Sequence, residues 1–229
     1  MASTILVTGT DTGVGKTQVA VALVHALRAE GLRVGVMKPV ASGCQRSAGG
    51  LRNDDAQALI EASGRDLPYA EVNPYAFEPP IAPHLAARAA GVAIDPAVLD
   101  AAYRRLAADC QVMVVEGAGG WRVPLSATLS FADWVSAHRW PVLLVVGLRL
   151  GCLNHAALSA DAIAQRTPLL GWIANRLPPE QPEWAANVDT LQELLGAPPL
   201  ACLAPADGAG SRLDPNVIKA LLSRVQVAV

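Results

Sequence analysis

The sequence lacks an apolar run long enough to cross a bilayer. Its longest predominantly apolar stretch, Trp140 to Leu148, has about half the length that a transmembrane helix needs. The first residues, MASTILVTGTD, contain neither a basic segment nor a cleavage-site pattern, so we expect no secretory signal. These absences predict a soluble, cytoplasmic protein without a membrane partner.

Patterns for binding zinc or nucleic acid are missing as well. The four cysteines form no CxxC pair and have no histidine at metal-ligand spacing, so we expect reduced thiols. Lys and Arg number 18 and Asp and Glu 20, which gives a formal net charge of −2, and no basic cluster stands out. A nucleic-acid-binding domain usually carries a basic face, so nucleic acid is not an expected partner.

The composition and the pattern of apolar residues favour a packed α/β domain. Apolar residues make up 52% of the 229 residues and charged residues 17%. Short apolar runs alternate with stretches of helical periodicity, as in parallel sheets that carry helices on both faces. No linker, repeat or low-complexity tract interrupts this alternation. We therefore expect residues 1–229 to form a single doubly wound domain with a mostly parallel sheet.

The expected elements follow from the apolar runs and from capping residues. The expected strands are 4–8, 33–38, 111–115, 141–146, 169–174 and 200–203. The expected helices are 16–30, 54–62, 96–108, 154–165, 183–195 and 214–225. A long polar loop, 42–52, follows the second strand and is of the type that folds over a substrate.

The segment GTDTGVGKTQ, residues 9–18, lies between the first expected strand and the first expected helix. Its glycines let backbone N–H groups converge on phosphate oxygens, and the helix N-terminus adds partial positive charge. Lys16 is then expected to bridge the β and γ phosphates of a nucleoside triphosphate, with the Thr17 hydroxyl on Mg²⁺. The spacing is unusual, because Thr10 occupies the position where the motif has its first glycine.

The altered spacing leaves Asp11 in the loop. Phosphates would repel its carboxylate, so we expect it to face Mg²⁺-bound water or a backbone N–H instead. Partner-switch ATPases of related sequence carry a lysine early in this loop, and none is present here. A GTPase typically has Asn-Lys-x-Asp after a strand, whereas residues 175–178 read Asn-Arg-Leu-Pro. Both classes are therefore disfavoured.

Further charged residues follow the expected strands. Glu116 comes after a buried run, at the sheet edge where ligands collect, and is a candidate for holding Mg²⁺. Asp54 and Asp55 open a helix; one could cap it and the other approach the metal, and spacing does not choose between them. Lys38 closes the second strand; a parallel strand beside the first would bring this lysine to the γ-phosphate. The alternative for Glu116 is a carboxylate that caps the next element. The alternative for Lys38 is a lysine at the end of a strand that is exposed to solvent.

A series of motifs, in this order along the chain, resembles the dethiobiotin synthetase family. They are GTDTGVGKT (9–17), KPVASG (38–43), LRNDDA (51–56), VNPY (72–75), VEGAGGW (115–121), FADW (131–134), LGCLNHA (150–156) and WIAN (172–175). The match runs from residue 4 to about residue 176 and is weak beyond Arg176. It implies a P-loop NTPase-like fold.

The resemblance implies an ATP-dependent cyclo-ligase of biotin biosynthesis. In that family CO₂ carbamoylates 7,8-diaminopelargonate, and a carbamate oxygen attacks the γ-phosphate of MgATP to give a carbamic–phosphoric anhydride. The second amine then closes the ureido ring of dethiobiotin, with ADP and phosphate as the other products. The family is homodimeric, with the substrate at the subunit interface. The remaining alternatives are a partner-switch ATPase and a sibling amidoligase acting on another acid.

The resemblance also implies roles for individual residues. It makes Lys38, Lys16 and Thr12 catalytic. It makes Thr17, Asp55 and Glu116 the metal ligands, which selects Asp55 over Asp54. The implied nucleotide-binding residues are Gly13, Val14, Gly15, Lys16, Thr17, Gln18, Asp55, Glu116, Gly117, Ala118, Gly119, Asn175, Arg176 and Pro205. The implied substrate-binding residues are Ser42, Leu150, Gly151, Cys152 and Asn154, the last four contributed by the neighbouring subunit. Many family members carry an acidic residue at the position of Gly13.

Overall fold

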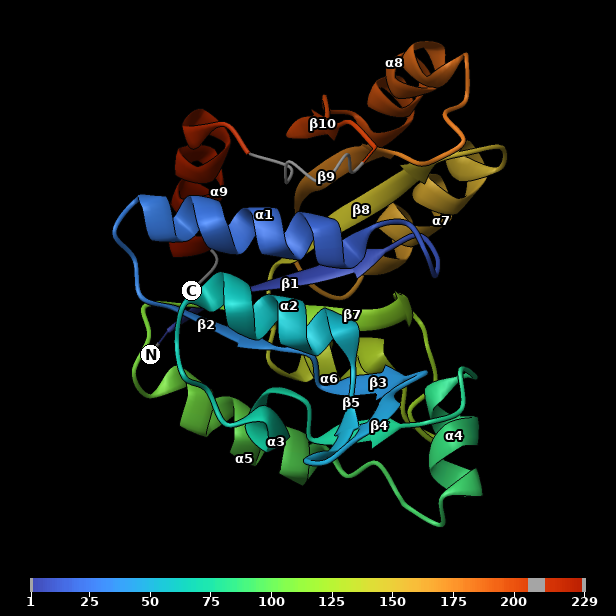
Figure 1. Cartoon of the computed structure of the whole chain (residues 1–229). Coiled ribbons are helices and arrows are strands. Elements are labelled where there is room, and N and C mark those ends of the chain that lie inside the picture. The colour runs from blue at the N-terminus through green and yellow to red at the C-terminus, as the bar shows by residue number, and fades with distance from the viewer. Residues whose placement is uncertain (1, 206–212, 228–229) are drawn as a thin grey trace.

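The computed structural model describes residues 2–205 and 213–227, and a parallel sheet forms its centre (Figure 1). Within the described residues this sheet has six strands in the order β10-β9-β8-β1-β7-β2. All neighbouring strands in it run parallel. The strands are β1 (Ser3–Gly9), β2 (Val34–Met37), β7 (Val112–Gly120), β8 (Val142–Leu148), β9 (Leu169–Arg176) and β10 (Ala201–Leu203).

Helices cover both faces of the sheet, which confirms the predicted doubly wound class (Figure 1). α1, α2 and α9 lie together on one face, and α5, α6, α7 and α8 belong to the other. The bounds of the helices are α1 Lys16–Ala29, α2 Asp54–Ser63, α3 Tyr69–Val72, α4 Pro83–Ala89, α5 Pro96–Ala107, α6 Phe131–Ala137, α7 Cys152–Ala164, α8 Trp184–Leu195 and α9 Pro215–Val227. Within the described ranges, none of these helices combines the length and the apolar character needed to cross a bilayer.

Burial on both faces explains why the central strands are so apolar. Every residue of β8 is buried, and Ile5, Leu6 and Val7 of β1 are completely inaccessible. Continuous apolar runs of this kind are typical of parallel strands that are covered by helices on both sides. In open α/β sheets, ligands bind at the edge formed by the carboxyl ends of the strands.

The strand order corrects one expectation. The second strand was expected beside the first, but β7 lies between them and pairs with both β1 and β2. The end of β2 therefore approaches the phosphate loop across β7 rather than directly. β7 is also longer than expected, because it continues through Glu116 to Gly120.

Three further features differ from the sequence-based expectations. α7 begins at Cys152 instead of Asn154, after Gly151 in a left-handed conformation. The polar loop 42–52 contains a small antiparallel hairpin, β4 (Gln45–Ser47) with β5 (Gly50–Arg52). A separate parallel pair, β3 (Val40–Ser42) with β6 (Tyr75–Phe77), was not expected.

Candidate active site

The phosphate loop has the backbone geometry that its glycines predict. Gly13 and Gly15 have φ values of +73° and +85°, a region that disfavours residues with a Cβ. α1 begins directly after Gly15, so its unpaired N–H groups face the loop. The loop is tied to the sheet on both sides: the Thr10 N–H donates to the Val145 carbonyl at 3.0 Å, and Asn175 Nδ2 donates to the Val14 carbonyl at 3.0 Å.

Glu116 lies in the middle of β7 and is the centre of a charged cluster. It is completely buried, and its Oε1 accepts hydrogen bonds from Lys38 Nζ at 2.5 Å and from the Thr17 hydroxyl at 2.8 Å. Its Oε2 is buried and has no hydrogen-bond partner among the residues that the structure describes. A carboxylate oxygen left in this state is available to a ligand.

Lys38 points into the molecule and not into solvent. Only 4% of the residue is exposed, and its ammonium also donates to Asp55 Oδ2 at 2.8 Å. Its backbone is held on both sides, because its N–H donates to the Val72 carbonyl at 2.8 Å and its carbonyl accepts from Asn73 Nδ2 at 2.7 Å. The solvated strand-end alternative is therefore wrong.

The choice between the two aspartates follows from the same geometry. Asn53 caps α2 by accepting a hydrogen bond from the Ala56 N–H at 3.2 Å, so neither aspartate is needed as the cap. Asp55 faces Lys38, whereas Asp54 is exposed to solvent. Of the two aspartates, only Asp55 contributes to the charged cluster.

Burial and opposite charges shift the pKa values in this cluster in different directions. Burial, with a smaller effect of the Lys38 charge, lowers the pKa of Lys16 to about 8. Burial alone would lower the pKa of Lys38, but the Glu116 and Asp55 carboxylates outweigh it and raise that pKa. Burial raises the pKa of Glu116 against the opposing effect of Lys38. Burial would raise the pKa of Asp55 too, but Lys38 outweighs it and lowers that pKa. Lys38 is therefore a protonated ammonium held between two carboxyl groups.

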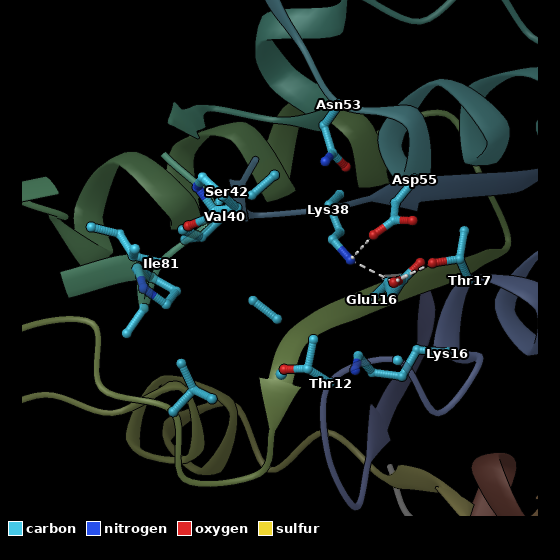
Figure 2. A pocket seen from close by; sticks show the side chains of 18 of the residues that line it. Thr12, Lys16, Thr17, Lys38, Val40, Ser42, Asn53, Asp55, Ile81 and Glu116 are labelled. Carbon is cyan, nitrogen blue, oxygen red and sulfur yellow. Dashed lines mark hydrogen bonds and ion pairs between the residues drawn. The ribbon is translucent and has the colours of Figure 1, made fainter. Parts of the chain in front are cut away.

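These residues surround a cavity of about 650 Å³ (Figure 2). Figure 2 shows Lys38, Asp55, Glu116 and Thr17 clustered on one side, with Lys16 and Thr12 on the phosphate-loop side of the same space. The expected site residues that line the cavity are Thr12, Gly13, Gly15, Lys16, Thr17, Lys38, Ser42, Asp55, Glu116, Ala118 and Gly119. These residues come from four separate parts of the chain.

The remaining part of the cavity wall was not foreseen from the sequence. It consists of Asn53 and eight apolar residues. The apolar residues are Val40, Ala41, Pro80, Ile81, Ala82, Pro83, Val123 and Pro124. Val40 and Ala41 belong to the motif KPVASG and Asn53 to LRNDDA, but these motifs did not identify them as part of the cavity wall. The other residues of this wall belong to none of the quoted motifs, and Pro83 begins α4. Asn73, which holds the backbone of Lys38, was also missed, although the motif VNPY contains it.

Four of the expected nucleotide-binding residues, Gln18, Asn175, Arg176 and Pro205, lie outside this cavity. Asn175 is completely buried, and its Oδ1 has no hydrogen-bond partner within the described ranges. Gln18 bridges this area, since its Nε2 donates to the Ala204 carbonyl at 3.2 Å and its Oε1 accepts from Asn175. Arg176 stacks over the Trp184 ring at 4.7 Å, and Pro205 follows β10 next to Ala204.

The turn expected to bind substrate lies apart from the cavity of its own chain. Leu150, Gly151, Cys152 and Asn154 are not among the residues that line it. Leu150 is 92% exposed, Cys152 is buried, and Gly151 starts α7 with a φ of +92°. Leu150, Gly151 and Asn154 are therefore exposed to solvent, apart from the cavity of their own chain.

The site consists of a strand, a glycine-rich loop and a helix that begins with lysine and threonine, and a buried carboxylate lies on the adjacent strand. This arrangement defines a P-loop nucleotide-binding protein. Solved structures of that fold agree. A ParA-family ATPase from Chlorobium tepidum superposes with a TM-score of 0.54 at 15% identity, covering 97% of this chain and 90% of that one. The septum site-determining protein MinD from Pyrococcus horikoshii, complexed with Mg-ADP, gives 0.53 at 17% identity, covering 97% and 86%. Likeness at this identity establishes the fold alone.

Sequence relatives define the family more narrowly. A family model described as an AAA domain matches residues 3–210. The ATP-dependent dethiobiotin synthetase BioD of Xanthomonas oryzae pv. oryzae is 51% identical over 193 residues, which cover 84% of this chain and 86% of that protein. The BioD protein of Pseudomonas paraeruginosa is 50% identical, covering 89% and 90%, and BioD 1 of Salmonella typhi is 48% identical, covering 93% and 97%. The chain belongs to the ATP-dependent dethiobiotin synthetase family.

Proposed function

We propose that this chain catalyses ATP-dependent closure of the ureido ring of dethiobiotin from 7,8-diaminopelargonate and CO₂. A carbamate formed on one amine attacks the γ-phosphorus of ATP through oxygen, and ADP leaves. The second amine then attacks the carbamate carbon, and phosphate leaves as the ring closes. The relatives named above, at about half identity over most of their length, support this assignment.

The observation that carries the proposal is the convergence of two lysines on one cavity. Lys16 enters it from the start of α1 and Lys38 from the end of β2, and the charge of Lys38 helps burial to lower the pKa of Lys16. A transferring phosphoryl group spreads negative charge over its oxygens, and preorganised cations stabilise that charge. We assign Lys16 and Lys38 to this task, with Thr12 beside the reacting groups.

The charged cluster also fits a magnesium ion. Among the described residues no three His, Cys, Asp or Glu side chains form a metal cluster, so a tightly held all-protein metal site is not present there. Mg²⁺ usually takes only one or two carboxylates, with phosphate and water completing its ligands. Thr17, Asp55 and the unpartnered oxygen of Glu116 supply such a set. When bound, the ion would neutralise charge on the β and γ phosphates.

We assign the adenine base to the region behind the phosphate loop. Asn175 Oδ1 is buried and has no hydrogen-bond partner in the described part of the chain, so it can accept a hydrogen bond from an exocyclic amine such as that of adenine. Gln18, Arg176 and Pro205 surround this position from α1, β9 and the segment after β10. A base carrying a carbonyl at the same position would leave Asn175 unsatisfied, so this arrangement favours ATP over GTP.

We also propose that the active site is completed by a second copy of the chain. Leu150, in the turn before α7, is 92% exposed, and Leu158, in the middle of α7, is 62% exposed. Burying them against a second subunit would bring the free N–H groups at the start of α7 to the partner's cavity. A substrate carboxylate is a suitable ligand for such a helix N-terminus, while Ser42 contacts the diamine end.

Phosphate release measures the proposed reaction directly. The protein is mixed with ATP, Mg²⁺ and bicarbonate, with or without 7,8-diaminopelargonate. Release is expected only when the diamine is present, together with a product of the mass of dethiobiotin. Release at the same rate without the diamine would instead support a nucleotide switch, and release with another diamine or acid but not this one would support a sibling ligase.

A further inference from the structure

Asp11 is the loop carboxylate for which the sequence offered no definite partner, and the structure gives it three contacts. Its Oδ1 accepts a hydrogen bond from the Thr12 N–H at 2.7 Å. Its Oδ2 forms an ion pair with the guanidinium of Arg149. Its backbone carbonyl accepts from Lys16 Nζ at 2.9 Å. Asp11 therefore joins two residues assigned to catalysis to an arginine outside the phosphate loop.

Arg149 stands where the sheet meets the turn that we assign to substrate binding. It follows β8 directly, and its carbonyl accepts a hydrogen bond from the Cys152 N–H at 3.0 Å, at the start of α7. Its backbone thus belongs to the turn while its side chain reaches the phosphate loop. The side chains of Arg149 and Asp11 are 43% and 46% exposed, so the pair forms at the surface beside the cavity.

We propose that Arg149 is a positioning residue: its ion pair with Asp11 holds residues 11–13 in the conformation that directs Thr12 and Lys16 at the reacting phosphate. A carboxylate in this loop is repelled by phosphates, and the guanidinium neutralises it and keeps it on the side of the β8–α7 turn. The pair also links the loop that binds the nucleotide to the turn that binds substrate. Its effect on catalysis rests on the proposed function, whereas its effect on nucleotide binding does not.

Three variants test the pair. Arg149→Met removes the charge and keeps an apolar stem, and Asp11→Asn keeps the acceptor for the Thr12 N–H while removing the charge. Each single variant should lower kcat for diamine-dependent phosphate release about tenfold, since small misplacements of catalytic groups are costly. Each should weaken the affinity for a fluorescent ADP about threefold, the range of an exposed ion pair. The double variant should be no worse than either single one, because both remove the same contact.

A conservative and a matched variant serve as controls. Arg149→Lys keeps a cation and should restore most of kcat. Arg166→Met breaks the surface ion pair between Arg166 and Asp133, whose two side chains are 30% and 37% exposed, respectively. This variant should leave kcat and ADP affinity unchanged. Equal melting temperatures of the Arg149 and Arg166 variants would exclude a general loss of stability as the cause.

Two results would overturn the proposal. In the first, Arg149→Met weakens ADP binding while Asp11→Asn behaves as wild type, which would mean that Arg149 binds phosphate by itself. In the second, the losses in the double variant multiply, which would mean that the two side chains act independently. Should the wild-type protein release no phosphate with the diamine while the ADP affinities show the shared loss, the proposed function fails and the role of the pair stands.

Discussion

Replacing Lys38 by methionine should destabilise the free protein chiefly through Glu116. Glu116 is completely buried, and the Lys38 ammonium lies 2.5 Å from its Oε1. Removing one partner of a buried ion pair leaves an uncompensated charge and costs about 3–5 kcal/mol. In a domain of this size each kcal/mol changes the melting temperature by about 2–4 °C. Lys38→Met should therefore lower the melting temperature by roughly 6–20 °C on these scales.

A second substitution separates the unpaired charge from the lost lysine. In the double variant Lys38→Met/Glu116→Gln no buried charge remains at this position, and the introduced amide oxygen still accepts the Thr17 hydroxyl. Replacing both members of a buried pair is often nearly neutral, so the double variant should melt within about 4 °C of the wild type.

The pH dependence of the single variant has a definite sign. Burial raises the pKa of Glu116, and without Lys38 nothing of comparable strength opposes that effect. The folded state of Lys38→Met then binds a proton at a higher pH than the unfolded state does. Its stability should rise as the pH falls from neutral toward the ordinary range of a glutamate, and the double variant should not show this rise.

Thermal unfolding followed by circular dichroism checks these expectations between pH 5 and 8. Lys219→Met is the matched control, because Lys219 is exposed on α9, and this change should leave the melting temperature unaffected. If the single and double variants melt at the same temperature, or the single variant shows no dependence on pH, the account of Glu116 is refuted.

Other predictions concern the nucleotide and the interface. Because the pKa of Lys16 is lowered to about 8, the free protein loses this charge as the pH rises through that value, and ADP affinity should fall. At about pH 9 the binding of ADP should be accompanied by uptake of a proton. Calorimetry in buffers of different ionisation enthalpy measures this uptake. Gly15→Ala should abolish ADP binding, since the added Cβ would lie 2.0 Å from Asn175 Nδ2. Gly13→Ala should weaken ADP binding far less, because Gly13 has a similar φ but open space around the added Cβ. Equal losses of affinity in the two variants would contradict this. Leu150→Asp should shift the protein toward monomer in analytical ultracentrifugation and raise the KM for the diamine, and an unchanged sedimentation coefficient would count against the interface.

Local patterns in the sequence were sufficient for the phosphate loop and for most of the sheet. Loop glycines, the apolar run before them and the helical periodicity after Lys16 are all contiguous, so spacing alone predicts a strand, a loop and a helix. The capping residue Asp95 and the following Pro96 likewise marked the start of α5, where Asp95 accepts from the Ala97 N–H at 2.8 Å. α6 was missed, although Ser130 and Asp133 form a capping box at its start.

Strand order and loop packing could not be read in the same way. The insertion of β7 between β1 and β2 depends on which helices pack together over the sheet, and no local spacing records it. The apolar wall around Ile81 and Val123 likewise joins loops that are distant in sequence. The role of Asn73 is a tertiary contact with the Lys38 carbonyl. Such features became visible only when the chain was folded.

The position of β7 has a consequence for the chemistry. Because this strand lies between β1 and β2, its residue Glu116 contacts both Thr17 of α1 and Lys38, which directly follows β2. Two ammonium groups and two carboxyl groups then surround a cavity whose charges nearly balance before a nucleotide binds. A triphosphate and its metal ion disturb that balance, since the ion needs the carboxylates and the phosphoryl group needs the lysines. Under the proposed function Lys38 therefore exchanges its carboxylate partners for phosphate. Because its backbone is held by hydrogen bonds to Val72 and Asn73, we expect the side chain rather than the backbone to move in this exchange.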